Sequence, residues 1–481
     1  MSEPISIARR AASTDHEPGI VPIVERAVTS EDSLGLENLR TYRIETWGCQ
    51  MNEHDSEKMA GALRSMGMRA AARESEADII LLNTCSVREK AAHKVFTRLG
   101  QLRRHKEHRP HMMIGVCGCV AQQEQEGIFR RAPHVDLVLG PRRIGSLPDL
   151  IRSARERRRV IGVFDPKDSL VHDLASAERV SRTRAYITIM EGCNKNCAFC
   201  IVPLTRGREA YRSPESILKE ARGCVEDGLP EIQLLGQNVN AWWHRGTESW
   251  DFTRLLGAVA LVPGLRRLRF TTSHPLHFKD SIIEMMADRP AICRHLHLPV
   301  QSGSNAILAR MRRGYTVEGY MERIARLRSR IPDIGLTTDI IVGFPGETED
   351  DLERTLDLVR EVRYDSIFSF VYSPRPGTSA VDLPDDIPEE LKMERLHRVQ
   401  EAQASIQLER HRAWIGREVE VLVDGPSARG GLVAGRTSQN HLVNLAGGPE
   451  LMGRLVTTRI TAAGPHSLGG TCLLDFPAPA E

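Results

Sequence analysis

The sequence predicts an α/β protein in three parts: a parallel α/β domain, a partial (βα)6 barrel, and a small all-β barrel at the C-terminal end. Strand-like and helix-like patterns alternate from about residue 41 to 145, and the alternation restarts at Ala185. Such alternation is typical of parallel sheets. After about residue 412 only short strand-like runs occur, separated by Gly, Asn, Asp and Pro. Short strands with turn signals favour a small barrel.

Composition limits the class of protein. The 481 residues exceed the roughly 250 that a single core supports, so we expect several domains. The net charge of +2 gives no global field that would indicate a nucleic-acid partner. Residues 1–40 contain no apolar signal-peptide core, and no run is long enough to span a membrane. We therefore expect a cytoplasmic protein with a mobile N-terminal extension (1–40), in which thiols serve as metal ligands more readily than as disulfides.

In the predicted first domain (41–150), three apolar runs each end in a turn that carries cysteine. The runs span residues 42–47, 77–83 and 111–116, and the cysteines after them are Cys49, Cys85, and the pair Cys117 and Cys119. Successive turns are about one strand–helix unit apart. Because the carboxyl ends of parallel strands meet at the ligand-binding edge of a sheet, we expect these thiols to converge.

A basic stretch follows the first domain. Residues 146–182 resemble a basic helix followed by a polar linker, which we place at 151–182. The arginines at 155 and 157–159 are best explained as a solvated helix face, and an RNA contact is the weaker interpretation.

The predicted middle domain (183–411) has six strand candidates. They lie at residues 186–190, 231–235, 268–272, 295–298, 336–342 and 365–371. Helical patterns such as Pro214–Asp227 and Thr348–Val362 separate them. Six units are fewer than the eight of a closed barrel, which favours a partial barrel. His295 and His297 alternate along one strand, and we expect packed or hydrogen-bonded histidines there, in preference to a metal pair.

The first strand of this domain leads into a C-x3-C-x2-C motif formed by Cys193, Cys197 and Cys200. Three thiolates can hold a [4Fe–4S] cluster and leave one iron open, since full protein ligation needs four cysteines. A structural zinc would need a fourth Cys or His close by, and the nearest histidines, His172 and His244, are not at zinc-finger spacing. We therefore favour a cluster.

This motif, with Phe199 before its last cysteine, resembles that of the radical S-adenosylmethionine (SAM) superfamily. The resemblance implies a cluster that binds and cleaves SAM inside a partial (βα)6 barrel. It also makes the turns after the barrel strands candidates for SAM contacts. The simpler alternative is that these residues only form strand-terminal turns. The candidate SAM-binding residues are Phe199, Gly236, Gln237, Asn238, Gln301 and Ser302.

Across residues 40–476 the chain resembles the radical SAM methylthiotransferases. The resemblance rests on nine segments: TWGCQMNEHDSEKMAG (46–61), NTCSVREKA (83–91), GCVAQ (118–122), EGCNKNC (191–197), LLGQNVNAW (234–242), TTSHP (271–275), LHLPVQSGS (296–304), GFPGET (343–348) and YSPRPGT (372–378). They look most like the members that modify isopentenylated adenosine in tRNA. The resemblance implies transfer of a methylthio group to carbon 2 of that base at position 37, next to the anticodon.

The resemblance also implies a second [4Fe–4S] cluster, held by Cys49, Cys85 and Cys119. The family pattern has one cysteine in the third turn, whereas this chain has Cys117 as well. The GC-x-AQ register assigns the ligand to Cys119. Alternation along the strand would point both thiols the same way, so Cys117 remains a possible surrogate.

The last domain (412–477) resembles the TRAM RNA-binding domain, through Gly435, Arg436, Thr437 and Asn440. We expect a monomer that takes tRNA as substrate and an electron-donor protein such as a flavodoxin or ferredoxin as partner. Arginine runs at residues 103–109 and 310–313 are further candidate RNA contacts. The alternatives are relatives that modify threonylcarbamoyl-adenosine or ribosomal protein S12, and a non-catalytic iron–sulfur or zinc RNA-binding module.

Overall fold

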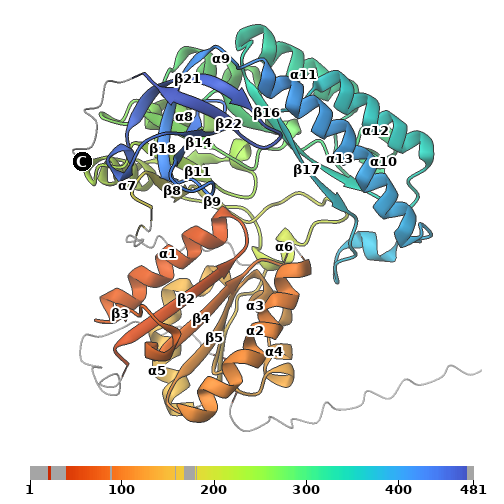
Figure 1. Cartoon of the computed structure of the whole chain (residues 1–481). Helices are drawn as coiled ribbons and strands as arrows, with labels where there is room; N and C mark the ends of the chain where they lie inside the picture. The colour runs from red at the N-terminus through yellow and green to blue at the C-terminus, as the bar shows by residue number, and fades with distance from the viewer. Residues whose placement is uncertain are drawn as a thin grey trace, which may run out of the picture.

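The computed structural model describes residues 20–22, 39–86, 89–157, 159–166, 179 and 181–473. It has the three predicted parts, arranged as a smaller N-terminal lobe against a larger lobe that contains the two barrels (Figure 1). Most of the expected extension (1–40), residues 167–178 of the expected linker, and residues 474–477 of the last domain lie outside the described residues. None of the described helices is both long and apolar enough to cross a membrane.

The N-terminal lobe is built on a seven-stranded parallel sheet. Its order is β1-β7-β6-β5-β4-β2-β3, formed by β1 (Ile20–Pro22), β2 (Thr41–Trp47), β3 (Arg69–Ala70), β4 (Ile79–Thr84), β5 (Met113–Gly118), β6 (Leu137–Leu139) and β7 (Arg159–Gly162). Helices cover both faces. They are α1 (Gln50–Ser65), α2 (Glu89–His108), α3 (Cys119–Glu124), α4 (Gly127–Arg131) and α5 (Leu147–Arg157). Two apolar cores lie between them and the sheet, as expected for a parallel sheet buried on both faces.

This sheet extends past residue 150, into the segment that we expected to be a linker. Helix α5 packs on the sheet, and β7 pairs with β6 in parallel register. Val160 and Ile161 of β7 are buried in the two cores. The run of arginines before this short strand concealed it, because only two consecutive apolar residues mark it in the sequence.

The middle domain is the predicted partial barrel. Its six strands form two three-stranded parallel sheets from β8 (Arg184–Thr188), β11 (Glu231–Leu235), β14 (Arg267–Phe270), β15 (His295–His297), β16 (Gly335–Val342) and β17 (Ser366–Val371). A parallel bridge between Leu268 and Ile292 joins the two sheets. The strand order of the barrel is therefore β8-β11-β14-β15-β16-β17. Within the described residues β8 and β17 do not pair, which leaves the barrel open between them.

Helices cover the outside of this barrel. They are α7 (Pro214–Glu226), α8 (Phe252–Ala260), α9 (Asp280–Asp288), α10 (Asn305–Arg310), α11 (Val317–Arg330), α12 (Glu349–Val362) and α13 (Glu389–Arg412). The main core lies between strands and helices and contains Leu336, Ile340 and Val342 of β16. Because side chains alternate along a strand, Thr337, Asp339 and Ile341 face the barrel interior.

The C-terminal part is a closed five-stranded barrel, which confirms the all-β prediction. Its order is β18-β19-β20-β22-β21, from β18 (Glu418–Pro426), β19 (Val433–Thr437), β20 (Leu442–Leu445), β21 (Leu455–Ala463) and β22 (Leu468–Cys472). Val421, Val443 and Ile460 fill its interior. Closure leaves no unpaired sheet edge on this small domain.

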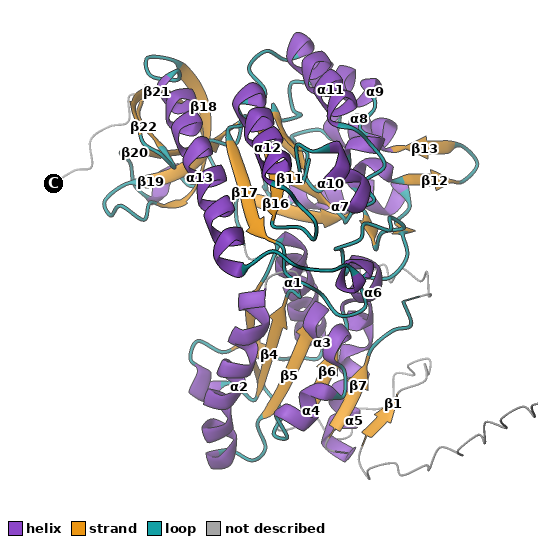
Figure 2. Cartoon of the chain, turned by 90° about the vertical axis from the view of Figure 1, so that its right-hand side faces the viewer, coloured by secondary structure: helices purple, strands orange, loops and turns teal. Residues whose placement is uncertain are grey.

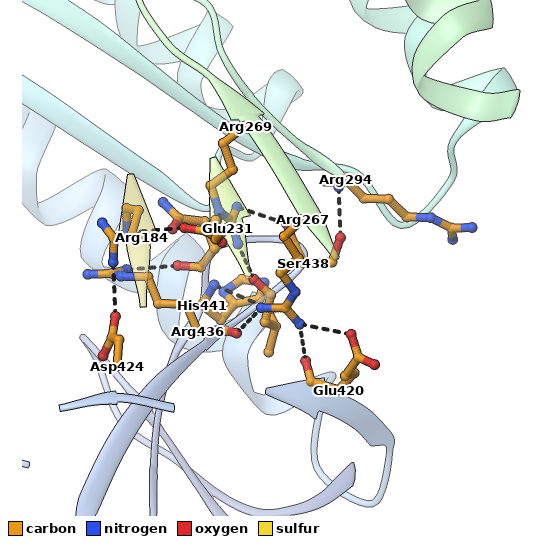
Figure 3. Close-up of polar contacts among 12 residues, drawn as sticks. Arg184, Glu231, Arg267, Arg269, Arg294, Glu420, Asp424, Arg436, Ser438 and His441 are labelled. Carbon is orange, nitrogen blue, oxygen red and sulfur yellow. Dashed lines mark hydrogen bonds and ion pairs between the residues drawn. The ribbon is translucent and has the colours of Figure 1, made fainter. Parts of the chain in front are cut away.

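Arginines near the N-terminal ends of strands in the middle domain bind the C-terminal barrel (Figure 3). Arg267 donates to the carbonyl oxygens of Arg436 at 2.6 Å and Glu420 at 2.8 Å. Arg269 donates to the carbonyl of Thr437 at 2.7 Å. The two barrels therefore meet at the end of the middle domain opposite to its cysteine loop.

Candidate functional site

The three N-terminal cysteines lie at the carboxyl edge of adjacent strands. Cys49 precedes α1 directly after β2, Cys85 follows β4, and Cys119 begins α3 after β5. A hydrogen bond from the Cys85 thiol lowers the pKa of Cys49 to about 6, and the positive charge of Arg206 adds to that effect. The parallel topology has thus brought together side chains that are far apart in the sequence.

Arg206 reaches this edge from the other lobe. It follows helix α6 (Val202–Thr205), which lies with α1 where the two lobes meet (Figure 1). Its guanidinium pairs with Asp55 of α1 at 2.5 Å, and it also hydrogen-bonds to the Cys119 thiol. Burial raises the pKa of Cys119, against the opposing effect of Arg206. A fixed positive charge therefore stands beside the thiols.

Several buried polar atoms around these thiols have no hydrogen-bond partner among the described residues. They are His54 Nε2, Asp55 Oδ1, Thr84 Oγ1, Ser86 Oγ and Arg206 Nη1. Buried polar groups normally find partners, so unsatisfied atoms around three thiols fit a polar, thiolate-bound group at this edge.

Cys117 has a different environment. It lies in β5, is fully buried, and packs with Met59, Leu81 and Leu139 in an apolar core. Burial raises the pKa of its thiol, which disfavours the thiolate that a metal needs. The chain turns at Gly118, whose φ is 86°, so the strand alternation that would align Cys117 with Cys119 ends there.

The second cysteine set lies on the loop between β9 (Met190–Glu191) and α6. Gly192 opens the loop with φ of 78°, and its N–H donates to the Gln237 side-chain oxygen at 2.5 Å. A side chain at Gly192 would place its Cβ 2.1 Å from the carbonyl oxygen of Arg208. Only glycine therefore fits this turn.

The thiols of this loop are half-buried and close enough to interact. Burial raises the pKa of Cys193 to about 12 and of Cys200 to about 11, and the neighbouring Cys197 side chain raises the pKa in both cases. Arg313 donates to the Cys197 sulfur at 3.3 Å. Arg313 itself is buried and also binds the carbonyl of Pro299, so this member of the run 310–313 faces the cysteines and not a surface.

The proposed SAM contacts lie on the cysteine loop and on the turns that follow β11 and β15. Phe199 and Ile341 pack against the same small apolar cluster. Asn238 donates to Glu209 at 3.3 Å, and its buried side-chain oxygen has no partner among the described residues. Gln301 has φ of 76° and bridges to Ile340 through its backbone. The buried Ser302 hydroxyl accepts from the Ser304 N–H at 3.1 Å and lies 3.4 Å from the Thr355 hydroxyl.

Gly236 and Gln237 support the loop directly. A Cβ at Gly236 would lie 2.5 Å from Cγ of Met190, so glycine lets β11 approach the strand before the cysteines. Gln237 uses its oxygen to hold Gly192, as described above. Both residues thereby fix where the cysteine loop begins.

Polar residues after β14 form part of the same edge, although none of them was among the predicted site residues. Ser273 Oγ, His274 Nε2 and His277 Nε2 are buried without partners in the described part of the chain. Burial lowers the pKa of His274 to about 2, with contributions from Arg313 and Lys195. The signal available in the sequence was their place in TTSHP, directly after a strand.

Each thiol set offers three sulfur donors next to unsatisfied polar atoms, a donor set suited to a [4Fe–4S] cluster with one open iron. In the described ranges no group of three or more His, Cys, Asp or Glu side chains is arranged to hold a metal ion.

Comparison with known proteins agrees with the division of the chain into three parts. Residues 41–140 match the uncharacterised protein family UPF0004, residues 187–359 the radical SAM superfamily, and residues 412–473 the TRAM domain. The chain is 48% identical over 443 residues to the tRNA-2-methylthio-N(6)-dimethylallyladenosine synthase of Solibacter usitatus, covering 91% of this chain and 99% of the relative. It is also 48% identical to that of Chromobacterium violaceum, covering 90% and 99%.

The chain belongs to the tRNA-2-methylthio-N(6)-dimethylallyladenosine synthase family. Members of this family are transferases of sulfur-containing groups that use a [4Fe–4S] cluster and SAM. The radical SAM methyltransferase TsrM from Kitasatospora setae, solved with cobalamin and a [4Fe–4S] cluster, superposes with a TM-score of 0.52. At 15% identity, over 71% of this chain and 77% of that one, it supports the fold alone.

Proposed function

We propose that this chain transfers a methylthio group to carbon 2 of N6-dimethylallyl-adenosine at position 37 of tRNA, next to the anticodon. One observation carries the proposal: Arg206 connects the cysteine sets of the two lobes. Arg206 follows the loop of one set and hydrogen-bonds a thiol of the other. The names of the relatives supply the substrate.

In this proposal, Cys193, Cys197 and Cys200 would hold the SAM-binding cluster. A second cluster would be held by Cys49, Cys85 and Cys119. When bound, these groups supply a radical from SAM and the sulfur that is transferred.

The chain's own residues provide the surroundings for this chemistry. Gln237 fixes the start of the cysteine loop through the Gly192 N–H. Arg313 and Arg206 place positive charge beside Cys197 and Cys119, where thiolates must persist. The burial of Asp55, Cys119 and Arg206 excludes water from the junction.

The partners belong to the same proposal. We assign SAM binding to residues 183–411 and tRNA binding to residues 412–477, supported by the match to the TRAM domain. Arg436 of this domain faces the middle barrel and donates to the carbonyl of Asn440, so other faces of the barrel are left for RNA. We further propose a cytoplasmic monomer reduced by a flavodoxin- or ferredoxin-like protein.

Nucleoside mass spectrometry of tRNA from cells that lack the protein tests the function. We expect the methylthio adduct of dimethylallyl-adenosine to disappear and to return with the wild-type chain, but not with Cys197→Ala. Retention of the adduct in the deleted cells contradicts the proposal. Loss of methylthio-threonylcarbamoyl-adenosine, or of the modification on ribosomal protein S12, would assign one of the alternative substrates.

A further inference from the structure

Two large aromatic side chains on the last barrel strand are exposed. Phe368 and Phe370 of β17 are 50% and 41% exposed, although they stand on a strand of the central domain. Most large apolar side chains of this domain are buried in its core. Neighbouring exposed rings offer apolar surface on which a ligand can bury its own apolar groups.

These rings face the interior of the partial barrel. In the register of the parallel pair, Phe368 lies beside Asp339 and Phe370 beside Ile341. The residues that alternate with these, such as Ile340, are buried in the outer core. Helix α13 lies along the outer face of β17 (Figure 2), so the two rings point the other way.

The aromatic face continues to the cysteine loop. Ile341, the neighbour of Phe370, packs in the same small cluster as Phe199 and Ala198, which lie between Cys197 and Cys200. An apolar path therefore runs from the candidate SAM site through Ile341 and along the inside of β17 to Phe368. Strand β17 also borders the open side of the barrel, where a substrate can enter.

Polar side chains lie beside Phe368 on the neighbouring strands. The ring of His297 contacts that of Phe368 at 5.9 Å between centroids, and His297 Nε2 lies 3.5 Å from Asp339 Oδ1. The Thr337 hydroxyl lies 3.0 Å from His297 Nδ1. Asp339 therefore has His297 as a partner, and the exposed surface of the two rings suits an uncharged alkyl group.

From this geometry we propose that Phe368 and Phe370 form the wall that receives the dimethylallyl group of the target adenosine. The inference rests on the proposed function, which brings an adenosine with a branched five-carbon alkyl group to the cysteine edge. The two rings give this chain its preference for the alkylated base over unmodified adenosine.

The test is equilibrium binding of the cluster-reconstituted chain to anticodon stem-loop RNAs that differ in one base. The base is dimethylallyl-adenosine, adenosine or threonylcarbamoyl-adenosine. We compare the wild type with the double variant Phe368→Ser/Phe370→Ser, and with Phe370→Leu, which keeps an apolar surface. Leu261→Ser is the matched control, because Leu261 is 61% exposed but lies at the end of α8, on the outside of the barrel.

We expect the double variant to lose on the order of 10- to 100-fold of the preference for the dimethylallyl RNA over the adenosine RNA. Its affinity for the adenosine RNA should stay unchanged. Phe370→Leu should keep most of the preference and Leu261→Ser all of it. An unchanged preference in the double variant overturns the inference, and so does an equal loss of affinity for both RNAs, which would assign the rings to the base or the RNA chain.

The same experiment separates this inference from the proposed function. If the wild type binds the dimethylallyl RNA no better than the others and adds no methylthio group to it, the proposed function is wrong. If the wild type prefers and modifies that RNA while the double variant retains the preference, only the role of Phe368 and Phe370 is wrong.

Discussion

Arg206 of the middle domain and Asp55 of α1 form a buried ion pair across the junction of the two lobes. The distance between the guanidinium nitrogen and the carboxylate oxygen is 2.5 Å, and the two side chains are 3% and 1% exposed. The pair lies beside the Cys119 thiol, so it joins the lobes next to the N-terminal cysteine set.

Asp55→Asn should strongly destabilise the junction. Removing one partner of a buried pair leaves the other charge uncompensated, which typically costs about 3–5 kcal/mol. We expect a lower midpoint for thermal unfolding of the N-terminal lobe. The control is Glu284→Gln, which removes an exposed partner of Arg330 at 2.5 Å and should leave the midpoint unchanged. Equal effects of the two variants would contradict a structural role for the buried pair.

Cys119→Ala and Cys117→Ala should differ in iron content. Cys119 lies beside Arg206 and the other thiols, whereas Cys117 packs in the apolar core. After anaerobic reconstitution we expect Cys119→Ala to fall from about eight to about four irons per chain, and Cys117→Ala to keep about eight. The reverse pattern, measured by iron and sulfide analysis, would assign the ligand to Cys117.

Gly192→Ala should disable the second cysteine set. The glycine has φ of 78°, and an added Cβ would lie 2.1 Å from a backbone oxygen, so the loop cannot keep its path. We expect loss of about four irons and of SAM cleavage, with the N-terminal set still occupied. Gly223→Ala, in a helix where nothing lies within 4 Å of the new Cβ, is the control. Full iron content in Gly192→Ala would show that the turn tolerates a side chain.

His441 should make the contact between the two barrels sensitive to acid. Burial lowers its pKa to about 4, and Asp365, 3.6 Å away, does not compensate. Because the unfolded pKa is about 6.5, the unfolded chain takes up the proton first, and stability is lost as the pH falls from about 6.5 to about 4. The full effect is about 3 kcal/mol.

His441→Gln should flatten this part of the pH dependence. The measurement is the unfolding midpoint of wild type and variant at several values between pH 7 and pH 4, where the difference isolates His441 from the other buried histidines. If the two curves run parallel through this range, His441 does not carry the effect.

Much of the candidate site follows from the sequence. Parallel strands end at one edge, so the convergence of Cys49, Cys85 and Cys119 could be predicted from three apolar runs and their spacing. The C-x3-C-x2-C loop is local and is visible in the sequence in the same way. Strand β11 has the bounds that alternation predicts, residues 231–235.

The tertiary structure alone decided the remaining relationships. Gly118 breaks the strand alternation between Cys117 and Cys119. The pattern of apolar residues does not predict a positive backbone angle at that glycine. Arg206 and Asp55 meet only because two lobes pack together, and Phe368 and Phe370 face an open barrel because β8 and β17 do not pair within the described chain. Periodicity reports which face of an element is apolar, but partners distant in the sequence are chosen by packing, which no local pattern contains.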